Sequence, residues 1–167
     1  MRIRKAKFPK KALALIGVYR RKELAELKCI KSKWACGKYR HKAIYHYRYA
    51  EGYRLFYVEL KALIDSADFG EMGHAKLEPS KLFNGVNERD FRVVQVLDHW
   101  RNGGFIDPPE ICLDRSQKIT FGDGRHRTVT AFHIGKKEIP VFVHVTGVKG
   151  LSKLIKLRRA KALSKTS

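Results

Sequence analysis

The chain has 167 residues, of which 44% are hydrophobic and 31% charged, and its formal net charge at pH 7 is +20. This length is enough for one domain with a buried core and short appendages, and no apolar run is long enough to span a membrane. The three cysteines, Cys29, Cys36 and Cys112, form no even disulfide framework, which favours a reducing compartment such as the cytoplasm.

The positive charge is concentrated at the two ends of the chain. Residues 1–61 carry a net charge of +14, residues 62–148 carry −1 and residues 149–167 carry +7. A near-neutral centre between basic flanks favours a polyanionic partner held by the flanks, and nucleic acid, in particular DNA, is the first candidate. The alternative is a basic surface that serves only solubility or resembles that of a ribosomal protein.

The N-terminal segment predicts an amphipathic helix that begins near Lys10, directly after Pro9. Its other face is basic, and its apolar residues recur near helical spacing around the weak point Gly17: Leu13, Ile16, Leu24 and Leu27. Such a helix either faces DNA or lies on an anionic membrane, and the small apolar face favours nucleic acid. A signal peptide is not expected, because the apolar run 12–18 is short and no small-residue cleavage site follows it.

Residues 28–59 mix aromatic side chains with lysine and arginine. Tyr45, Tyr47 and Tyr49 alternate with other residues, a period of two that predicts a strand, and residues 54–60 are expected to return as its hairpin partner. Aromatic rings between basic residues can stack nucleobases while the cations hold phosphates. Tyrosines on one face of a strand equally well pack in a core, and this second interpretation is the more ordinary one.

The same segment offers one candidate metal site. Its four possible ligands are Cys29, Cys36, His41 and His46. The short gap between cysteines that is typical of zinc sites is absent, so the spacing favours zinc only weakly.

From residue 74 onward the pattern alternates between strands and helices. A helix is expected to start with Asn87 as its cap and to end at Asn102-Gly103-Gly104, with Phe91, Val94, Leu97 and Trp100 on one face. The other expected elements are strands 111–113 and 118–121 joined by 114–117, a helix 125–134 ended by Gly135, and a strand 139–145. A resemblance described below adds a first strand within 76–82. This order predicts a small α/β core.

Three segments follow from these predictions. Residues 1–73 are expected to form a basic extension with a helix and a hairpin, and residues 74–148 the core. Residues 149–167 are expected to form a basic tail with a short amphipathic helix.

The chain is organised around a glycine turn between the strand 118–121 and the helix 125–134. Its sequence is Gly122-Asp123-Gly124-Arg125-His126-Arg127. Glycines let backbone N–H groups approach a ligand closely, and the first turn of a helix adds free N–H donors and the positive end of its dipole. Three basic residues at a helix N-terminus oppose that dipole unless an anion offsets them, which favours a phosphate-binding turn over a solvated helix start.

The run from Ile119 to Val143 reads I-T-F-G-D-G-R-H-R-T-V-T-A-F-H-I-G-K-K-E-I-P-V-F-V. It resembles the signature of the ParB/sulfiredoxin superfamily, in which a strand leads through a D-G-x-H-R-type turn into a helix that ends in glycine, followed by an E-I-P-V strand. The resemblance extends back to about Lys76 and covers less than half of the chain. It implies a small mixed-sheet α/β core and a nucleotide or phosphate site at the glycine turn.

Two departures from the superfamily narrow the implied function. Sulfiredoxins carry a reactive cysteine directly before His-Arg, whereas Arg125 stands at that position and Cys112 lies on a strand, which excludes sulfinic-acid repair by that thiol. ParB segregation proteins continue far beyond this core, whereas a short tail follows Val145, so centromere binding of that kind is not expected.

The resemblance then implies a DNA-acting nucleotide-binding protein from a plasmid or phage. Its activity would be that of a nuclease or an NTPase, with ATP or CTP and Mg²⁺ as cofactors, and phosphotransfer is the less favoured activity. A plasmid fertility-inhibition protein that acts on a protein of a DNA-transfer system fits this pattern by analogy. The alternative is a non-catalytic DNA- or partner-binding module that uses the turn as a phosphate clamp.

Each residue of the turn has an expected role. Arg125, His126 and Arg127 would stabilise phosphoryl charge, and His126 could instead act as a general acid or base. Asp123 would either cap the helix or ligate a divalent ion, and capping is the simpler role. The expected phosphate-binding set is Gly122, Gly124, Arg125, His126, Arg127 and Thr128. Further candidates near the site are Glu78, Lys81, Asp107, Glu110 and Asp114, and His133 is expected to be structural.

Overall fold

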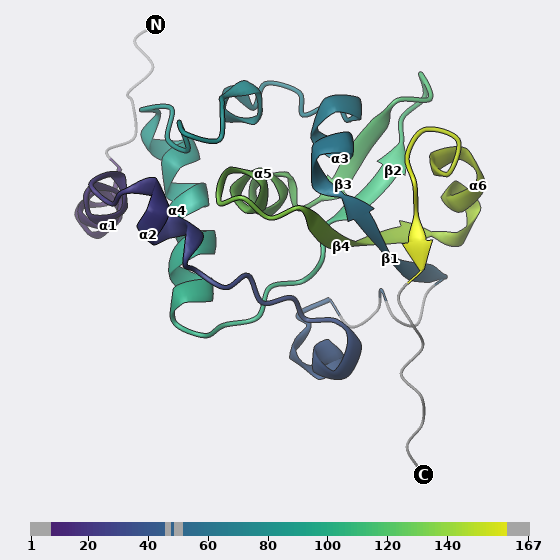
Figure 1. Cartoon of the computed structure of the whole chain (residues 1–167), viewed down its shortest axis with the longest axis horizontal. Coiled ribbons are helices and arrows are strands. Elements are labelled where there is room, and N and C mark those ends of the chain that lie inside the picture. Colours follow the sequence, from purple (N-terminus) through teal and green to yellow (C-terminus); the bar gives the residue numbers. More distant parts are fainter. Residues whose placement is uncertain (1–7, 46–47, 49–51, 160–167) are drawn as a thin grey trace, which may run out of the picture.

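A computed structural model describes residues 8–45, 48 and 52–159 of the chain (Figure 1). The chain is a mixed α/β protein with a five-stranded sheet in the order β3-β2-β4-β1-β5. The strands are β1 (Tyr53–Glu59), β2 (Glu110–Leu113), β3 (Ile119–Asp123), β4 (Glu138–His144) and β5 (Arg158–Arg159). β2 and β4 are parallel, and the other neighbouring pairs are antiparallel.

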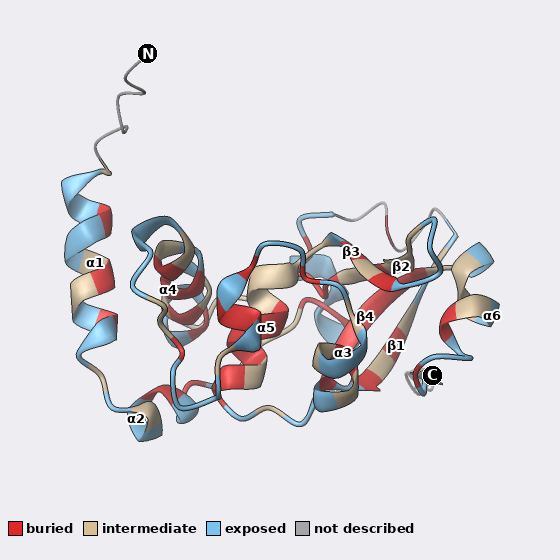
Figure 2. Ribbon diagram, turned by 90° about the horizontal axis from the view of Figure 1, so that it is seen from above, coloured by how far each residue is buried: buried red, intermediate tan, exposed pale blue. Residues whose placement is uncertain are grey.

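The helices lie on both sides of this sheet. They are α1 (Lys10–Arg20), α2 (Leu24–Lys28), α3 (Leu60–Ser66), α4 (Asn87–Arg101), α5 (Arg125–His133) and α6 (Val148–Leu151), with the short 3-10 helices η1 (Gly37–Lys42), η3 (Gly73–Lys76) and η4 (Val145–Gly147). Figure 2 shows α1 packed on α4, α4 on α5, and α5 beside the sheet, with α6 beyond it. No helix in the described part of the chain has the length and apolar character needed to cross a membrane.

The core forms where these layers meet. β4 is a central strand, and its Ile139, Val141, Phe142 and Val143 are all buried, which explains the continuous apolar run in place of alternation. α4 buries Val93, Val94, Leu97 and Trp100, the spacing of one helix face. Each such fully buried apolar side chain stabilises the fold by about 1.5–3 kcal/mol.

The predicted elements around the glycine turn are confirmed. α4, the β2–β3 hairpin, α5 and β4 all form near the expected residues, and Gly135 follows α5 with a positive φ of 80°. The expected cap of α4 is wrong by one residue, because Asn87 is already helical and Val86 occupies the cap position without a side-chain hydrogen bond.

The strand expected within residues 76–82 is wrong. η3 ends at Lys76, and the residues that follow are loop, with Glu78, Pro79 and Ser80 exposed. The sheet position beside β4 is taken by β1, which pairs with β4 from Tyr53 to Glu59. The sheet therefore crosses the boundary expected between residues 73 and 74.

The prediction of a strand at residues 45–49 is also wrong for the residues of this segment that the structure describes. Tyr45 lies outside any strand, and the backbone N–H of Arg48 donates to the Tyr45 carbonyl across 3.2 Å, as in a turn. Tyr47 and Tyr49 lie outside the described residues. Residues 54–60 do contribute a strand, β1, but its partners are β4 and β5.

Both terminal helices differ from the prediction. The N-terminal helix breaks after Arg20, because Glu23 caps α2 in a reciprocal capping box with Glu26. Its buried face is Ala12, Ile16 and Tyr19, while Leu13 is 40% exposed. The expected helix within the tail 149–167 is confined to its first residues in α6, and the chain then forms β5 along β1. Residues 160–167 lie outside the described part.

Candidate functional site

The glycine turn is shaped by its fit to the neighbouring strand. Gly124 has φ 93° and ψ 15°, in the left-handed region, and α5 begins at Arg125. A Cβ on Gly124 would lie 2.6 Å from Pro109 Cβ, and one on Gly122 would lie 2.7 Å from Glu110 Oε1. Protein atoms therefore fill the space beside both glycines.

Asp123 is held by two arginines. Its Oδ2 accepts hydrogen bonds from Arg127 Nη2 at 2.7 Å and from Arg48 Nη2 at 3.2 Å. Burial raises the pKa of Asp123, but these two guanidinium groups outweigh it and hold the pKa below its ordinary value. Arg48 is 3% exposed and also pairs with Glu110 at 3.2 Å, and Glu110 accepts a hydrogen bond from Tyr53.

This network corrects the expected role of Asp123 as a helix cap. Gly124 occupies the cap position of α5, and no side chain caps the helix. Asp123 instead forms an ion pair with Arg127, and this ion pair holds the Arg127 side chain against the end of β3. Arg48, from the N-terminal segment, was not among the expected site residues, and only the folded chain brings it to the turn.

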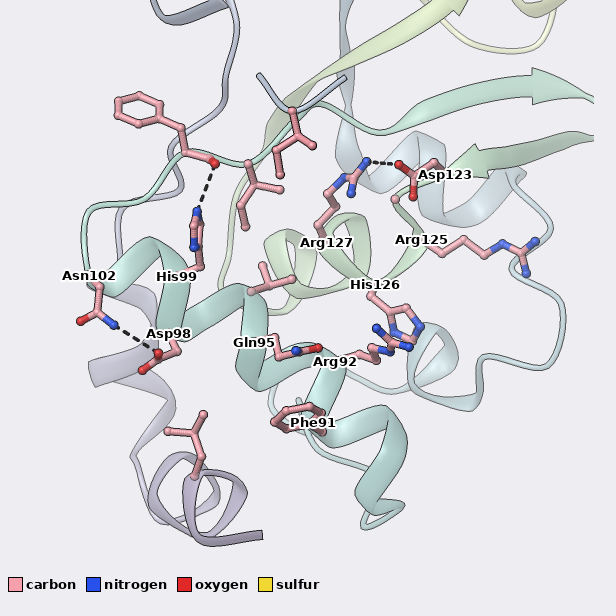
Figure 3. A pocket seen from close by; sticks show the side chains of 16 residues that line it. Phe91, Arg92, Gln95, Asp98, His99, Asn102, Asp123, Arg125, His126 and Arg127 are labelled. Atoms are coloured by element: carbon pink, nitrogen blue, oxygen red, sulfur yellow. Dashed lines mark hydrogen bonds and ion pairs between the residues drawn. The ribbon is translucent and has the colours of Figure 1, made fainter. Parts of the chain in front are cut away.

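The three consecutive basic residues do not converge. Successive positions on an α-helix are about 100° apart, so their side chains point in different directions. Figure 3 shows Arg127 turned to Asp123, Arg125 extended away from it, and His126 beside Arg92 of α4. The Arg125 guanidinium reaches the loop at Gly70, where an added Cβ would lie 3.3 Å from it.

His126 belongs to a group of packed histidines. Its ring lies 5.5 Å from the ring of the buried His74, and Nε2 of His133 contacts the His74 carbonyl oxygen at 2.8 Å. Burial, then the positive charge of Arg92 and Arg125, lowers the pKa of His126 to about 4. His126 is therefore neutral near pH 7, and its Nδ1 has no hydrogen-bond partner among the described residues.

A cleft of about 640 Å³ lies between α4, the glycine turn and residues 102–106 (Figure 3). Its lining includes the apolar side chains of Phe91, Val96 and Phe105. It also includes four basic side chains, Arg92, Arg125, His126 and Arg127, and the carboxylates of Asp98 and Asp123. A second cleft of about 430 Å³ shares Arg92, Arg125 and His126 with the first and adds Arg89.

Three of these arginines lack an ion-pair partner among the described residues, and Glu71 and Glu88 line the second cleft with them. Arg89, Arg92 and Arg125 form no ion pair with any carboxylate in the described part of the chain. Unpaired guanidinium groups at a cleft suit an anionic ligand, because they supply directional donors and a fixed positive charge. Sequence reasoning missed Arg89 and Arg92; their signal is a pair of basic residues at i and i+3 on the polar face of α4.

The additional expected residues do not line either cleft. Asp107 is buried and accepts hydrogen bonds from the backbone N–H groups of Ile44 at 2.9 Å and Tyr45 at 2.8 Å. Asp114 closes the β2–β3 hairpin at the far end from Asp123, and Lys81 lines a separate pocket. The buried hydroxyl of Thr128 donates to the Gly124 carbonyl.

The carboxylates at the turn do not fit a metal ion held by the protein. Asp123 and Glu110 are both engaged by Arg48, whose positive charge opposes a cation there. Within the described residues, no group of three or more His, Cys, Asp or Glu side chains is arranged to hold a metal ion. Cys29 is exposed, Cys36 is buried, and His46 lies outside the described residues.

No protein-family model, curated protein or solved structure matches this chain.

Proposed function

We propose that the protein is a DNA-acting nucleotide-binding protein that binds a nucleoside triphosphate, ATP or CTP, in the cleft between α4 and α5, and hydrolyses that nucleotide or DNA there. One observation carries the proposal: Arg92 and Arg125 reach this cleft from two helices without a carboxylate ion-pair partner among the described residues, and apolar side chains line the same cleft.

The size and lining of the cleft support this choice of ligand. Its volume of about 640 Å³ is within the usual range of small-molecule sites. The apolar part of the lining, with Phe91 and Phe105, suits a nucleobase, and the arginines suit phosphates. The resemblance of residues 119–143 to the ParB/sulfiredoxin signature supports a phosphate site at the same turn.

The hydrolytic step would depend on charge and on a proton acceptor. Arg92 and Arg125 would stabilise the negative charge that spreads over the phosphoryl oxygens. His126 is neutral near pH 7 and its Nδ1 is enclosed in the protein, so solvent rather than this ring nitrogen would accept the proton of the attacking water. No step is assigned to a protein-held metal ion, because the carboxylates at the turn are paired with arginines.

Nucleotide binding tests the proposal directly. Arg92→Ala and Arg125→Ala should each weaken the binding of ATP or CTP by roughly tenfold to a hundredfold, since a hydrogen bond to a charged group contributes about 1.5–3 kcal/mol. Arg115→Ala is the matched control, because Arg115 is exposed on the β2–β3 hairpin and lines neither cleft. Calorimetric titration measures the affinity, and thermal melts show whether each variant is folded. Equal affinities in all three variants would refute the nucleotide site.

The net charge of +20 supports DNA as the second ligand. We expect the affinity of the full chain for duplex DNA to fall at least a hundredfold between about 50 and 200 mM salt, as happens when several phosphates are contacted. The full chain is needed, because removal of residues 1–61 would also remove β1 from the sheet. An affinity that is insensitive to salt would contradict the role of the basic flanks.

A non-catalytic phosphate clamp is the second candidate. It is favoured by the pairing of Asp123 and Glu110 with arginines, which leaves neither carboxylate available as a base. Labelled ATP or CTP and plasmid DNA should be incubated with the protein, with Mg²⁺ and with EDTA. Hydrolysis or nicking that Arg125→Ala abolishes supports the enzyme, whereas binding without either reaction supports the clamp.

A further inference from the structure

A basic and aromatic surface continues beyond the proposed nucleotide cleft. Tyr39 lies in η1, its side chain is 39% exposed, and its ring centroid is 4.6 Å from that of Phe105, which lines the cleft. The Lys33 ammonium lies 5.6 Å from the centre of the Phe105 ring, and that of Lys38 lies 5.1 Å from the Tyr39 ring. Two adjacent aromatic rings, each with an ammonium group nearby, therefore lie at this end of the cleft.

Tyr39 differs from most other aromatic residues of the N-terminal segment. Trp34 packs edge-on against Trp100 at 5.3 Å and belongs to the core. Tyr45 is exposed to a similar extent, at 42%, and the Arg48 guanidinium lies 4.7 Å from its ring centre. The Tyr39 ring, in turn, contacts Phe105, which lines the cleft. The exposed Tyr39 ring is thus in a position to receive a planar ligand group, and η1 around it contains Lys38, Arg40 and Lys42 without an acidic residue.

The basic surface also continues at the opposite end of the cleft. The second cleft shares Arg92 and Arg125 with the first and extends to Arg89. The surface thus runs from Tyr39 past Phe105 and Arg92 to Arg89, across both clefts. A single strand can stack a base on the rings at one end of this surface while its phosphates contact the arginines at the other end.

We propose that this surface is the path of a single-stranded nucleic acid, with a base stacked on Tyr39 and Phe105 and the following phosphates on Arg92, Arg125 and Arg89. The inference rests on the proposed function, because the same arginines hold the phosphates in both. A single strand fits better than a duplex, since paired bases are stacked within the double helix and cannot reach an aromatic ring in a cleft.

Fluorescence anisotropy with fluorescein-labelled dT12 and the full chain tests this path. Tyr39→Leu should weaken binding by about tenfold, because base–aromatic stacking is lost while an apolar side chain of similar size remains. Tyr39→Phe keeps the ring and should bind like the parent. Arg89→Ala should weaken dT12 binding more than ATP binding, and Arg115→Ala should change dT12 binding far less than Arg89→Ala.

The outcomes separate this inference from the proposed function. If Tyr39→Leu binds dT12 as tightly as the parent, the path is wrong even if ATP binds normally. The path is also wrong if Tyr39→Leu weakens the binding of a duplex of the same length as much as it weakens the binding of dT12. If dT12 binding depends on Tyr39 and Arg92 but no nucleotide binds, the strand path is supported and the nucleotide site is refuted. If neither ligand responds to Arg92→Ala, both proposals are overturned.

Discussion

Replacement of Gly124 by alanine is expected to lower the free energy of unfolding by about 2–6 kcal/mol. A non-glycine residue in the left-handed region costs about 1–3 kcal/mol, and overpacking adds about 1–3 kcal/mol. Both terms apply, because Gly124 has φ 93° and its added Cβ would lie 2.6 Å from Pro109 Cβ. Urea denaturation followed by circular dichroism measures the change.

Gly85 provides a matched control for the backbone term. Its φ is 82°, close to that of Gly124, but an added Cβ would have no heavy atom within 4 Å. Gly85→Ala should therefore cost only the backbone strain. The difference between the two variants measures the close contacts with Pro109 and with Arg127 Nε, which would lie 2.7 Å from the added Cβ, and equal costs would contradict the close packing of the turn.

The packing of Gly124 changes how the turn is understood. From the sequence, the glycines were expected to admit a ligand phosphate, and in the structure they admit Pro109 and Glu110 of the neighbouring strand. The sequence-based argument was correct that a side chain is excluded there. It could not show what occupies the space, because that depends on how closely the β2–β3 hairpin brings Pro109 and Glu110 to the turn.

Local patterns predicted the elements that local interactions determine. The spacing of Val94, Leu97 and Trp100 predicted α4, and the glycine turn between apolar runs predicted the change from β3 to α5. The position of β1 next to β4 could not be predicted in this way, since the two strands are separated by most of the core sequence. The expectation of a first strand at residues 76–82 came from the resemblance of the sequence to the ParB/sulfiredoxin signature and not from a local pattern.

The candidate site was predicted only in part. His126 and Arg125 do line the cleft, but Arg127 is committed to Asp123, because three adjacent helix positions cannot face one ligand. Arg89 and Arg92 come from α4, and the sequence gives no sign that α4 packs on α5. Arg48 reaches Asp123 from a segment that was expected to be a strand. Each omission concerns a contact between distant segments.

The free energy of unfolding is expected to fall steeply as the pH is lowered from about 6.5 to about 4. Burial is the main cause that lowers the pKa of His74 and of His126 to about 4, from an ordinary value of 6.5. Between these values the unfolded chain binds protons that the folded chain does not, so stability is fully present above about pH 6.5 and is lost toward pH 4. For the fully buried His74 alone the loss is about 3 kcal/mol.

The variant His74→Leu tests whether the buried histidines cause the loss of stability at low pH. The groups that act on His74 are His126, His133, Arg89 and Asp90, and neither of its ring nitrogens has a hydrogen-bond partner among the described residues. Leucine should therefore cost little near pH 7.5 and should make the decline in stability below pH 6.5 shallower, measured by urea denaturation at a series of pH values. His41→Leu, at an exposed histidine, should decline like the parent. A saturating nucleotide should also reduce the decline, because its phosphates would offset the charge of Arg92 and Arg125 beside His126 and so raise the His126 pKa. If His74→Leu declines as steeply as the parent, the acid sensitivity arises elsewhere and the buried histidines are not its source.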